Sequence, residues 1–177
     1  ENISETFIGD NIKINLADMD VKSWEYDLKN DLKLVEFLLE EMHKITPEHD
    51  YKLQDIKSHI DNKIKNPINA NNKKAIVFTA FADTADYLYE HISKYIQTNH
   101  HLHSAKVTGS KNTTTADGSY DFQSILALFS PKSKDKDVLM PNDSNEVDIL
   151  IGTDCISEGQ NLQDCDYLIN YDIHWNP

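Results

Sequence analysis

The sequence predicts an α/β fold in which a parallel sheet is flanked by helices, and two observations predict it. Four short apolar runs, at residues 75–79, 104–108, 147–151 and 167–171, have the length of buried strands. Segments of helical periodicity or of crossover length separate these runs, and strands that alternate with such segments pair in parallel. Ligands of open parallel sheets collect at the carboxyl ends of the strands. Polar residues or glycine stand at these ends, so we expect a binding edge that contains Thr79, Gly109, Ser110, Thr153 and Asp172.

Two helical segments precede the first strand. Residues 23–45 carry apolar side chains spaced by threes and fours, with Ser23 as a plausible N-cap and Pro47 beyond the end. Residues 48–65 repeat this pattern. We expect the first to be a plain core-facing helix, with a regulatory helix pair as the alternative. Residues 1–22 are predicted to be an extended arm, 23–72 a helical segment, and 73–177 the main lobe.

The elements after the first strand follow in order. A helix is expected at 82–96, with Asp83 as a reasonable cap near its start, and another at 120–129. Residues 111–118 and 132–146 are predicted to be polar, solvated loops. Phe78 and Phe81 flank the first strand end and are predicted to be core residues, so Thr79 is the candidate functional residue there.

The charge balance limits the binding role of the chain. Thirty acidic residues oppose seventeen lysines, no arginine is present, and the formal net charge is −13. A free-standing nucleic-acid binder would show a basic footprint, although amides, hydroxyls and a few lysines can still contact phosphates. An arginine finger is worth about 10³–10⁵ in the rate of phosphoryl transfer, and this chain cannot supply one.

Several classes of site and location are disfavoured. No apolar run reaches the roughly 18 residues of a membrane span, and no signal peptide is visible, so a cytoplasmic protein without membrane contact is predicted. The first residue is not Met, so we expect an excised fragment. Cys155 and Cys165 are expected to be reduced, partly buried thiols. The histidines at 100, 101 and 103 lack a complete ligand set, so no metal site is predicted.

Residues 147–177 carry a more specific pattern: VDILIGTDCISEGQNLQDCDYLINYDIHWNP. The pattern contains Thr153-Asp154, the run from Ser157 to Gln163, Tyr171-Asp172, and Trp175-Asn176-Pro177 in this order. It resembles motif V and the following strand of superfamily 2 helicases, most closely the Swi/Snf-like DNA translocases of the bacterial HepA/RapA type. Residues 74–81 resemble motif IV of this family, and residues 105–110 resemble its motif IVa. The family's basic residue near the start of the 120–129 helix is missing here.

The resemblance implies a RecA-like C-terminal lobe, truncated before motif VI. ATP would lie in a cleft shared with an N-terminal RecA-like lobe, which supplies the P-loop and most contacts to Mg²⁺. The nucleotide side would include Glu158, Gly159, Gln160 and Asn161, and the nucleic-acid side Thr79, Gly109, Ser110 and Thr153. Duplex DNA is the expected partner. No catalytic residue falls within the chain, and the arginine fingers are expected beyond Pro177. The chain alone is therefore predicted to lack ATPase activity.

Two other interpretations remain open. A dinucleotide-binding Rossmann enzyme needs a glycine-rich turn after the first strand, and Thr79-Ala80-Phe81-Ala82 has no glycine. A non-catalytic regulatory or protein-interaction domain with a helicase-like fold agrees with the acidic charge, but the intact motif V argues against it. A Gln-x-x-x-Arg-x-x-Arg-like segment beyond Pro177 would favour the motor over the regulatory domain.

Overall fold

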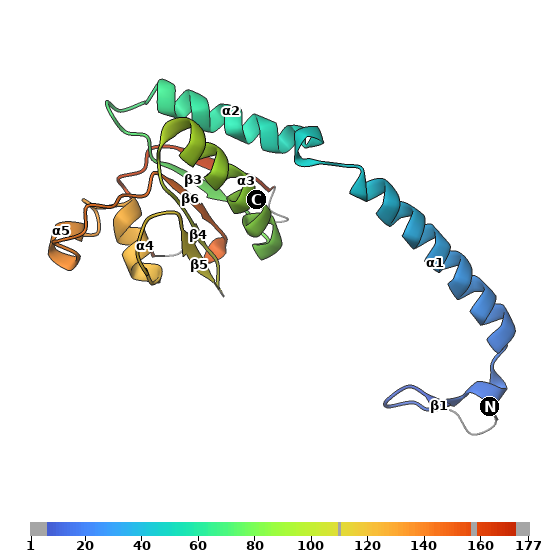
Figure 1. Ribbon diagram of the computed structural model, residues 1–177. Helices are drawn as coiled ribbons and strands as arrows, with labels where there is room; N and C mark the ends of the chain where they lie inside the picture. Colours follow the sequence, from blue (N-terminus) through green and yellow to red (C-terminus); the bar gives the residue numbers. More distant parts are fainter. Residues whose placement is uncertain (1–6, 110, 157–158, 173–177) are drawn as a thin grey trace. The chain divides into compact units, whose positions relative to one another are not determined.

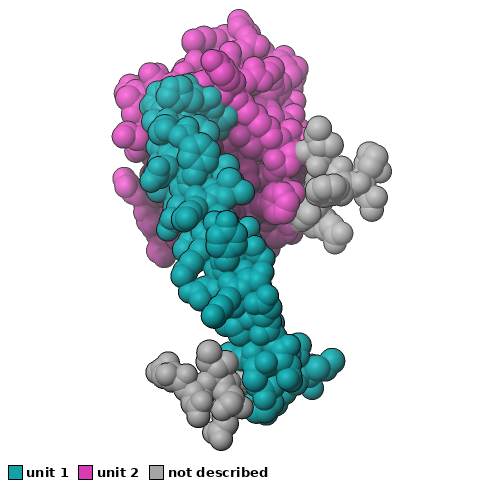
Figure 2. All heavy atoms as spheres, turned by 90° about the vertical axis from the view of Figure 1, so that its right-hand side faces the viewer, with its two compact units in different colours: residues 1–50 teal, residues 51–177 magenta. Residues whose placement is uncertain are grey.

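The computed structural model describes residues 7–109, 111–156 and 159–172 (Figure 1). The chain separates into two units, residues 1–50 and residues 51–177, which Figure 2 shows in different colours. The helices predicted at 23–45 and 48–65 therefore belong to different units. No helix in the described ranges is both long and apolar enough to span a membrane.

The first unit begins with a small hairpin. Strands β1 (Phe7–Ile8) and β2 (Ile14–Asn15) pair antiparallel in a segment that the sequence predicted to be an extended arm. Gly9 turns the chain with φ +99°, and a Cβ atom there would meet the Ile12 carbonyl oxygen at 2.2 Å. Only glycine fits this position without strain.

Helix α1 (Val21–His43) follows the hairpin and corrects one prediction. Its N-cap is Asp20, which accepts a hydrogen bond from the Ser23 N–H at 3.1 Å, so Ser23 is not the cap. The helix was expected to face a core, but none of its residues is buried, and Leu28 and Leu32 are 52% and 56% exposed. The described part of the first unit adds only the hairpin and short 3-10 turns, which form no second layer to cover the apolar stripe.

The second unit is built on a mixed sheet. Its described strands run in the order β5-β4-β6-β3-β7, namely Asn112–Thr114, Ser104–Val107, Ile149–Gly152, Ala75–Phe78 and Leu168–Asn170. Strands β4, β6, β3 and β7 are parallel, which confirms the predicted α/β fold. Strand β5 pairs antiparallel with β4 in a segment predicted to be a loop. The link between the apolar runs 147–151 and 167–171 has the length of a crossover between neighbouring parallel strands, but in the structure β3 lies between β6 and β7.

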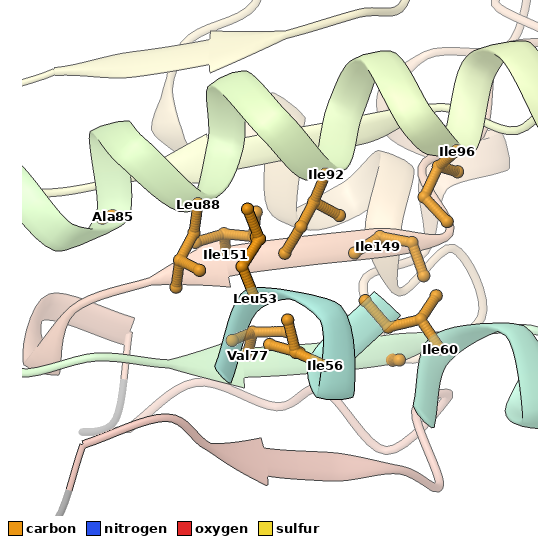
Figure 3. Close-up of a cluster of buried hydrophobic side chains, with 11 residues drawn as sticks. Leu53, Ile56, Ile60, Val77, Ala85, Leu88, Ile92, Ile96, Ile149 and Ile151 are labelled. Atoms are coloured by element: carbon orange, nitrogen blue, oxygen red, sulfur yellow. The ribbon is translucent and has the colours of Figure 1, made fainter. Parts of the chain in front are cut away.

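Helices α2 (Tyr51–Lys65) and α3 (Ala82–His100) cover one face of the sheet (Figure 3). Alternate strand residues point to this face because side chains in a strand alternate between the two sides. In Figure 3 the α3 side chains Leu88, Ile92 and Ile96 meet the sheet next to those of α2. The α2 contribution consists of Leu53, Ile56 and Ile60, which are at most 3% exposed. Helix α2 is therefore part of the lobe core.

Helix α4 (Phe122–Phe129) packs on the opposite face. Its N-cap is Asp121, whose carboxylate accepts the Ser124 N–H at 2.8 Å. The connection from β6 to β7 crosses the same face through Ile156, Leu162 and Cys165. Helices thus lie on both faces, as the sequence predicted. A short helix, α5 (Lys136–Leu139), interrupts the stretch 132–146, which was expected to be a loop.

Candidate functional site

Three neighbouring strands, β4, β6 and β3, end side by side. The Thr79 N–H donates to the Gly152 carbonyl at 3.0 Å, and the Thr153 N–H donates to the Val107 carbonyl at 3.3 Å. Gly109 follows β4 by two residues. The structure therefore brings Thr79, Gly109 and Thr153 to one edge of the sheet, where the sequence placed them. Ser110 lies outside the described residues.

Thr79 is held inside this edge. The residue is 2% exposed, and its hydroxyl donates to the Asp172 carboxylate at the end of β7. Asp172 also accepts the Ala80 N–H at 3.1 Å and pairs with the Lys52 ammonium at 3.4 Å. Burial alone would raise the pKa of Asp172, but the bonds from Thr79, Ala80 and Lys52 outweigh it and hold that pKa below its usual range. The Thr79 hydroxyl thus joins β3 to β7, and its nucleic-acid contact stays a prediction.

The turn after β4 is closed by the side chain of its residue Thr108. The Thr108 hydroxyl donates to the Lys111 carbonyl at 2.9 Å and accepts the Lys111 N–H at 3.1 Å. Gly109 is exposed in this turn, and a Cβ atom there would meet nothing within 4 Å. Its surface is therefore accessible to a ligand such as a phosphate.

The chain folds back sharply after β6. A 3-10 helix, Asp154–Ile156, follows Thr153, and the Ile156 N–H donates to the Thr153 carbonyl at 3.2 Å. A Cβ atom on Gly152 would meet Ile156 Cδ1 at 2.3 Å, so a side chain at 152 would displace the buried Ile156 side chain. The partly exposed Thr153 donates its hydroxyl to Cys155 Sγ at 3.5 Å. Both cysteines are free, as expected, but Cys155 is exposed and not partly buried.

The same connection continues to the predicted nucleotide residues. Gly159 is exposed and has φ +70°, a left-handed conformation that glycine adopts without strain. Gln160 is half-buried, lines a cavity of about 590 Å³ with Phe78, and accepts a hydrogen bond from the Lys134 ammonium at 2.9 Å. Asn161 is exposed, and its amide has no hydrogen-bond partner among the described residues. Glu158, the fourth predicted residue, lies outside the described ranges, as does Ser157.

The chain was compared with protein families and with curated proteins. It matches the family described as the helicase conserved C-terminal domain over residues 52–177, more than two thirds of its length. The chain belongs to this family. No curated protein matches it. The matched range starts in α2 and contains the whole described sheet, so the edge belongs to a helicase-like motor lobe. Membership implies part of an ATP-dependent helicase, and nucleic acid is the partner that it suggests.

One aromatic residue of this helicase domain departs from the prediction. Phe78 packs against the core on the α4 face, as expected. Phe81, which was also expected in the core, is 60% exposed. It occupies the N-cap position of α3, between the end of β3 and the helix, and there it lies outside the two covered faces of the sheet.

Two features of the described side chains bear on which ligand could bind here. No group of three or more His, Cys, Asp or Glu side chains in the described ranges could hold a metal. An exposed amide such as that of Asn161 can both donate to and accept from ribose hydroxyls. Sequence reasoning gave no role to Lys134 or Gly152, since neither a single lysine in a polar stretch nor a single glycine carries a periodic signal that points to its partner.

Proposed function

We propose that the domain is the second motor lobe of an ATP-dependent translocase of the Swi/Snf-like type, which moves along duplex DNA. In this proposal it forms one wall of an ATP cleft and touches the nucleic-acid backbone. The other wall is the N-terminal RecA-like lobe, which carries the P-loop and most contacts to Mg²⁺. Family membership supports the motor lobe. The translocase type and the DNA substrate rest on the motif V pattern of residues 147–177.

One observation carries the proposal. A single connection begins at Thr153, beside the ends of β4 and β3, and leads within eight residues to Asn161. Its first residue is fixed to β4 through the Val107 carbonyl, and Ile156 is 2% exposed. A displacement at Asn161 when nucleotide binds would therefore reach the fixed Thr153 through only a short length of chain. Packed, continuous elements of this kind carry energetic coupling between two sites.

Each residue in this proposal has a limited task. Asn161 binds the ribose through its amide, and Gly159 lets the backbone approach the nucleotide closely. Thr153 and the Gly109 turn offer a hydroxyl and backbone N–H groups to DNA phosphates. Charge that develops on the transferring phosphoryl group is stabilised by residues outside this chain, because the chain holds no arginine and no P-loop.

The test uses a protein in which this domain is joined to a first RecA-like lobe. Asn161→Ala is expected to raise the KM for ATP by roughly five- to thirtyfold, the effect of about 1–2 kcal/mol of lost binding. Thr153→Ala is expected to weaken duplex DNA binding about fivefold, because one hydrogen bond to phosphate is lost. The matched controls are the exposed residues Asn142→Ala and Thr98→Ala, for which no change is expected.

The outcome separates the proposal from its alternative. Unchanged ATPase, DNA binding and translocation in both variants would contradict the site assignments. A wild-type protein that neither hydrolyses ATP nor binds nucleic acid would support the regulatory domain, which the net charge of −13 and the lack of arginine favour. If RNA and not duplex DNA stimulated the ATPase activity, the motor function would stand and duplex DNA would be the wrong substrate.

A further inference from the structure

The turn at residues 130–134 is fastened to the segment 160–164, although 26 or more residues separate the bonded pairs in sequence. Two groups of hydrogen bonds connect them, one centred on the Asp164 carboxylate and one formed by the Lys134 ammonium. We call the contacts of Ser130, Lys132, Ser133 and Lys134 with Gln160 and Asp164 the 130/160 clamp. Sequence analysis expected residues 132–146 to be a solvated loop, so these contacts are a finding of the structure.

The Asp164 end is a dense set of hydrogen bonds. The carboxylate accepts the N–H of Lys132 at 2.7 Å and both the N–H and the hydroxyl of Ser133 at 3.0 and 2.5 Å. Its own N–H donates to the hydroxyl of the fully buried Ser130 at 3.3 Å. Burial would raise the pKa of Asp164, but the bonds from Ser133 and Lys132 outweigh it and lower that pKa. Asp164 is thus ionised at neutral pH and holds the turn.

The Lys134 end reaches the predicted nucleotide residues. The Lys134 N–H is bonded to the Ser130 carbonyl at 3.0 Å, which fixes the start of its side chain. Its ammonium donates to Gln160 Oε1 at 2.9 Å, and both residues are half-buried. A hydrogen bond with a charged donor is stronger than a neutral one. Lys134 therefore engages one lone pair of the Gln160 amide oxygen and ties this side chain to the turn, whereas the neighbouring Asn161 is exposed.

We propose that Lys134 is a positioning residue for nucleotide binding, and that Gln160 is its anchor and does not contact the nucleotide. The clamp holds the segment on both sides of Asn161, through Gln160 before it and Asp164 after it, so that Asn161 is presented in one place. This inference deepens the proposed function and rests on it. It also gives Gln160 a different role from the nucleotide contact that the sequence predicted.

The main experiment measures steady-state ATPase kinetics in the two-lobe protein. Lys134→Ala is expected to raise the KM for ATP roughly five- to thirtyfold with kcat within about twofold, because binding is lost and the chemical step is untouched. Lys134→Arg retains a charged donor and is expected to restore most of the affinity. The matched control is Lys132→Ala, which removes an equal charge from the exposed side chain next to it and keeps the backbone N–H that Asp164 uses.

Gln160 gives an independent test, because its two possible roles predict different KM values for ATP. A carboxylate still accepts from Lys134, so Gln160→Glu is expected to leave the KM for ATP within about twofold of wild type. If Gln160 touched the nucleotide phosphates, the new negative charge would repel them and raise the KM strongly. The Lys134→Ala/Gln160→Ala double variant is expected to match Lys134→Ala alone, since both remove one interaction.

Each result decides the proposal. Equal KM values for the Lys134→Ala and Lys132→Ala variants, or a large rise in the Gln160→Glu variant, would overturn it. Thermal unfolding of every variant checks the fold, and Lys134→Arg and Gln160→Glu remain informative if the alanine variants do not fold. A wild-type protein without ATPase activity refutes the proposed function instead. If the wild type is active and the Lys134 variants have an unchanged KM for ATP, only the positioning role is refuted.

Discussion

Asp172 shows how much one side chain at the sheet edge determines. It follows β7 and accepts hydrogen bonds from Thr79 and Ala80 after β3, and it pairs with Lys52 in the first turn of α2. The Lys52 ammonium also lies 3.8 Å from the centre of the Tyr171 ring. One carboxylate therefore joins two strands and a helix next to the candidate site. The motif predicted that Asp172 stands there, but its three partners are visible only in the folded lobe.

Removal of this carboxylate should destabilise the lobe. Asp172→Ala leaves the buried Thr79 hydroxyl and the Ala80 N–H without their acceptor, and we expect a loss of about 1–3 kcal/mol in the free energy of unfolding. Urea denaturation at pH 7 measures this loss. The matched control is Asp55→Ala on α2, whose side chain is 75% exposed and whose pair with His59 should contribute little.

The same substitution has a predicted pH dependence. Because the folded-state pKa of Asp172 lies below the unfolded value of about 3.9, its ionised form stabilises the lobe fully above that value. This contribution is lost as the pH falls through the lowered folded-state pKa. The difference in unfolding free energy between wild type and Asp172→Ala should therefore shrink from pH 7 to pH 3, and a difference that grows on acidification would contradict the hydrogen-bonded carboxylate.

At the scale of elements, sequence periodicity predicted the parallel strands and the helices of the lobe because these bury a regular apolar face. It could not predict β5, whose residues Asn112–Thr114 are polar and pair with the backbone of β4. Periodicity also cannot tell whether an apolar stripe meets a partner. Helices α1 and α2 carry similar stripes, yet α2 is packed in the core and α1 has no buried residue. The difference comes from the tertiary layers, which no local pattern encodes.

This contrast between helices predicts different costs for similar truncations. Ile60 of α2 is fully buried among Ile149 and the α3 side chains, so Ile60→Ala should destabilise the chain by about 2–5 kcal/mol. Leu32 of α1 is 56% exposed, and Leu32→Ala should change the free energy of unfolding by no more than about 0.5 kcal/mol. Chemical denaturation of the whole chain, followed by circular dichroism, compares the two variants. Equal losses for the two variants would show that the α1 stripe is covered in solution.

At the scale of the whole molecule, the groups at the sheet edge contrast with the charge of the chain. The described edge supplies neutral donors and backbone groups, while the chain as a whole carries a net charge of −13 and no arginine. Such a field repels a polyanion such as ATP or DNA at a distance. Motif patterns predicted which residues stand at the edge, because motifs are local in sequence. They could not predict the 130/160 clamp, because Lys134 and Gln160 meet only after β6 and its connection have folded over the α4 face.

The lack of arginine and of a P-loop leads to a prediction for the 177-residue chain by itself. The purified 177-residue chain should release no phosphate from ATP above a buffer blank, with or without duplex DNA, because it lacks both the P-loop and the arginine finger that is worth about 10³–10⁵ in rate. Phosphate release is measured next to the Asn161→Ala variant of the same chain. A trace rate that is equal in both belongs to a contaminating enzyme, since the exposed Asn161 amide is the proposed ribose contact. A rate that disappears in the variant would mean that this lobe hydrolyses ATP alone, and the proposal of a cleft shared with a second lobe would then be wrong.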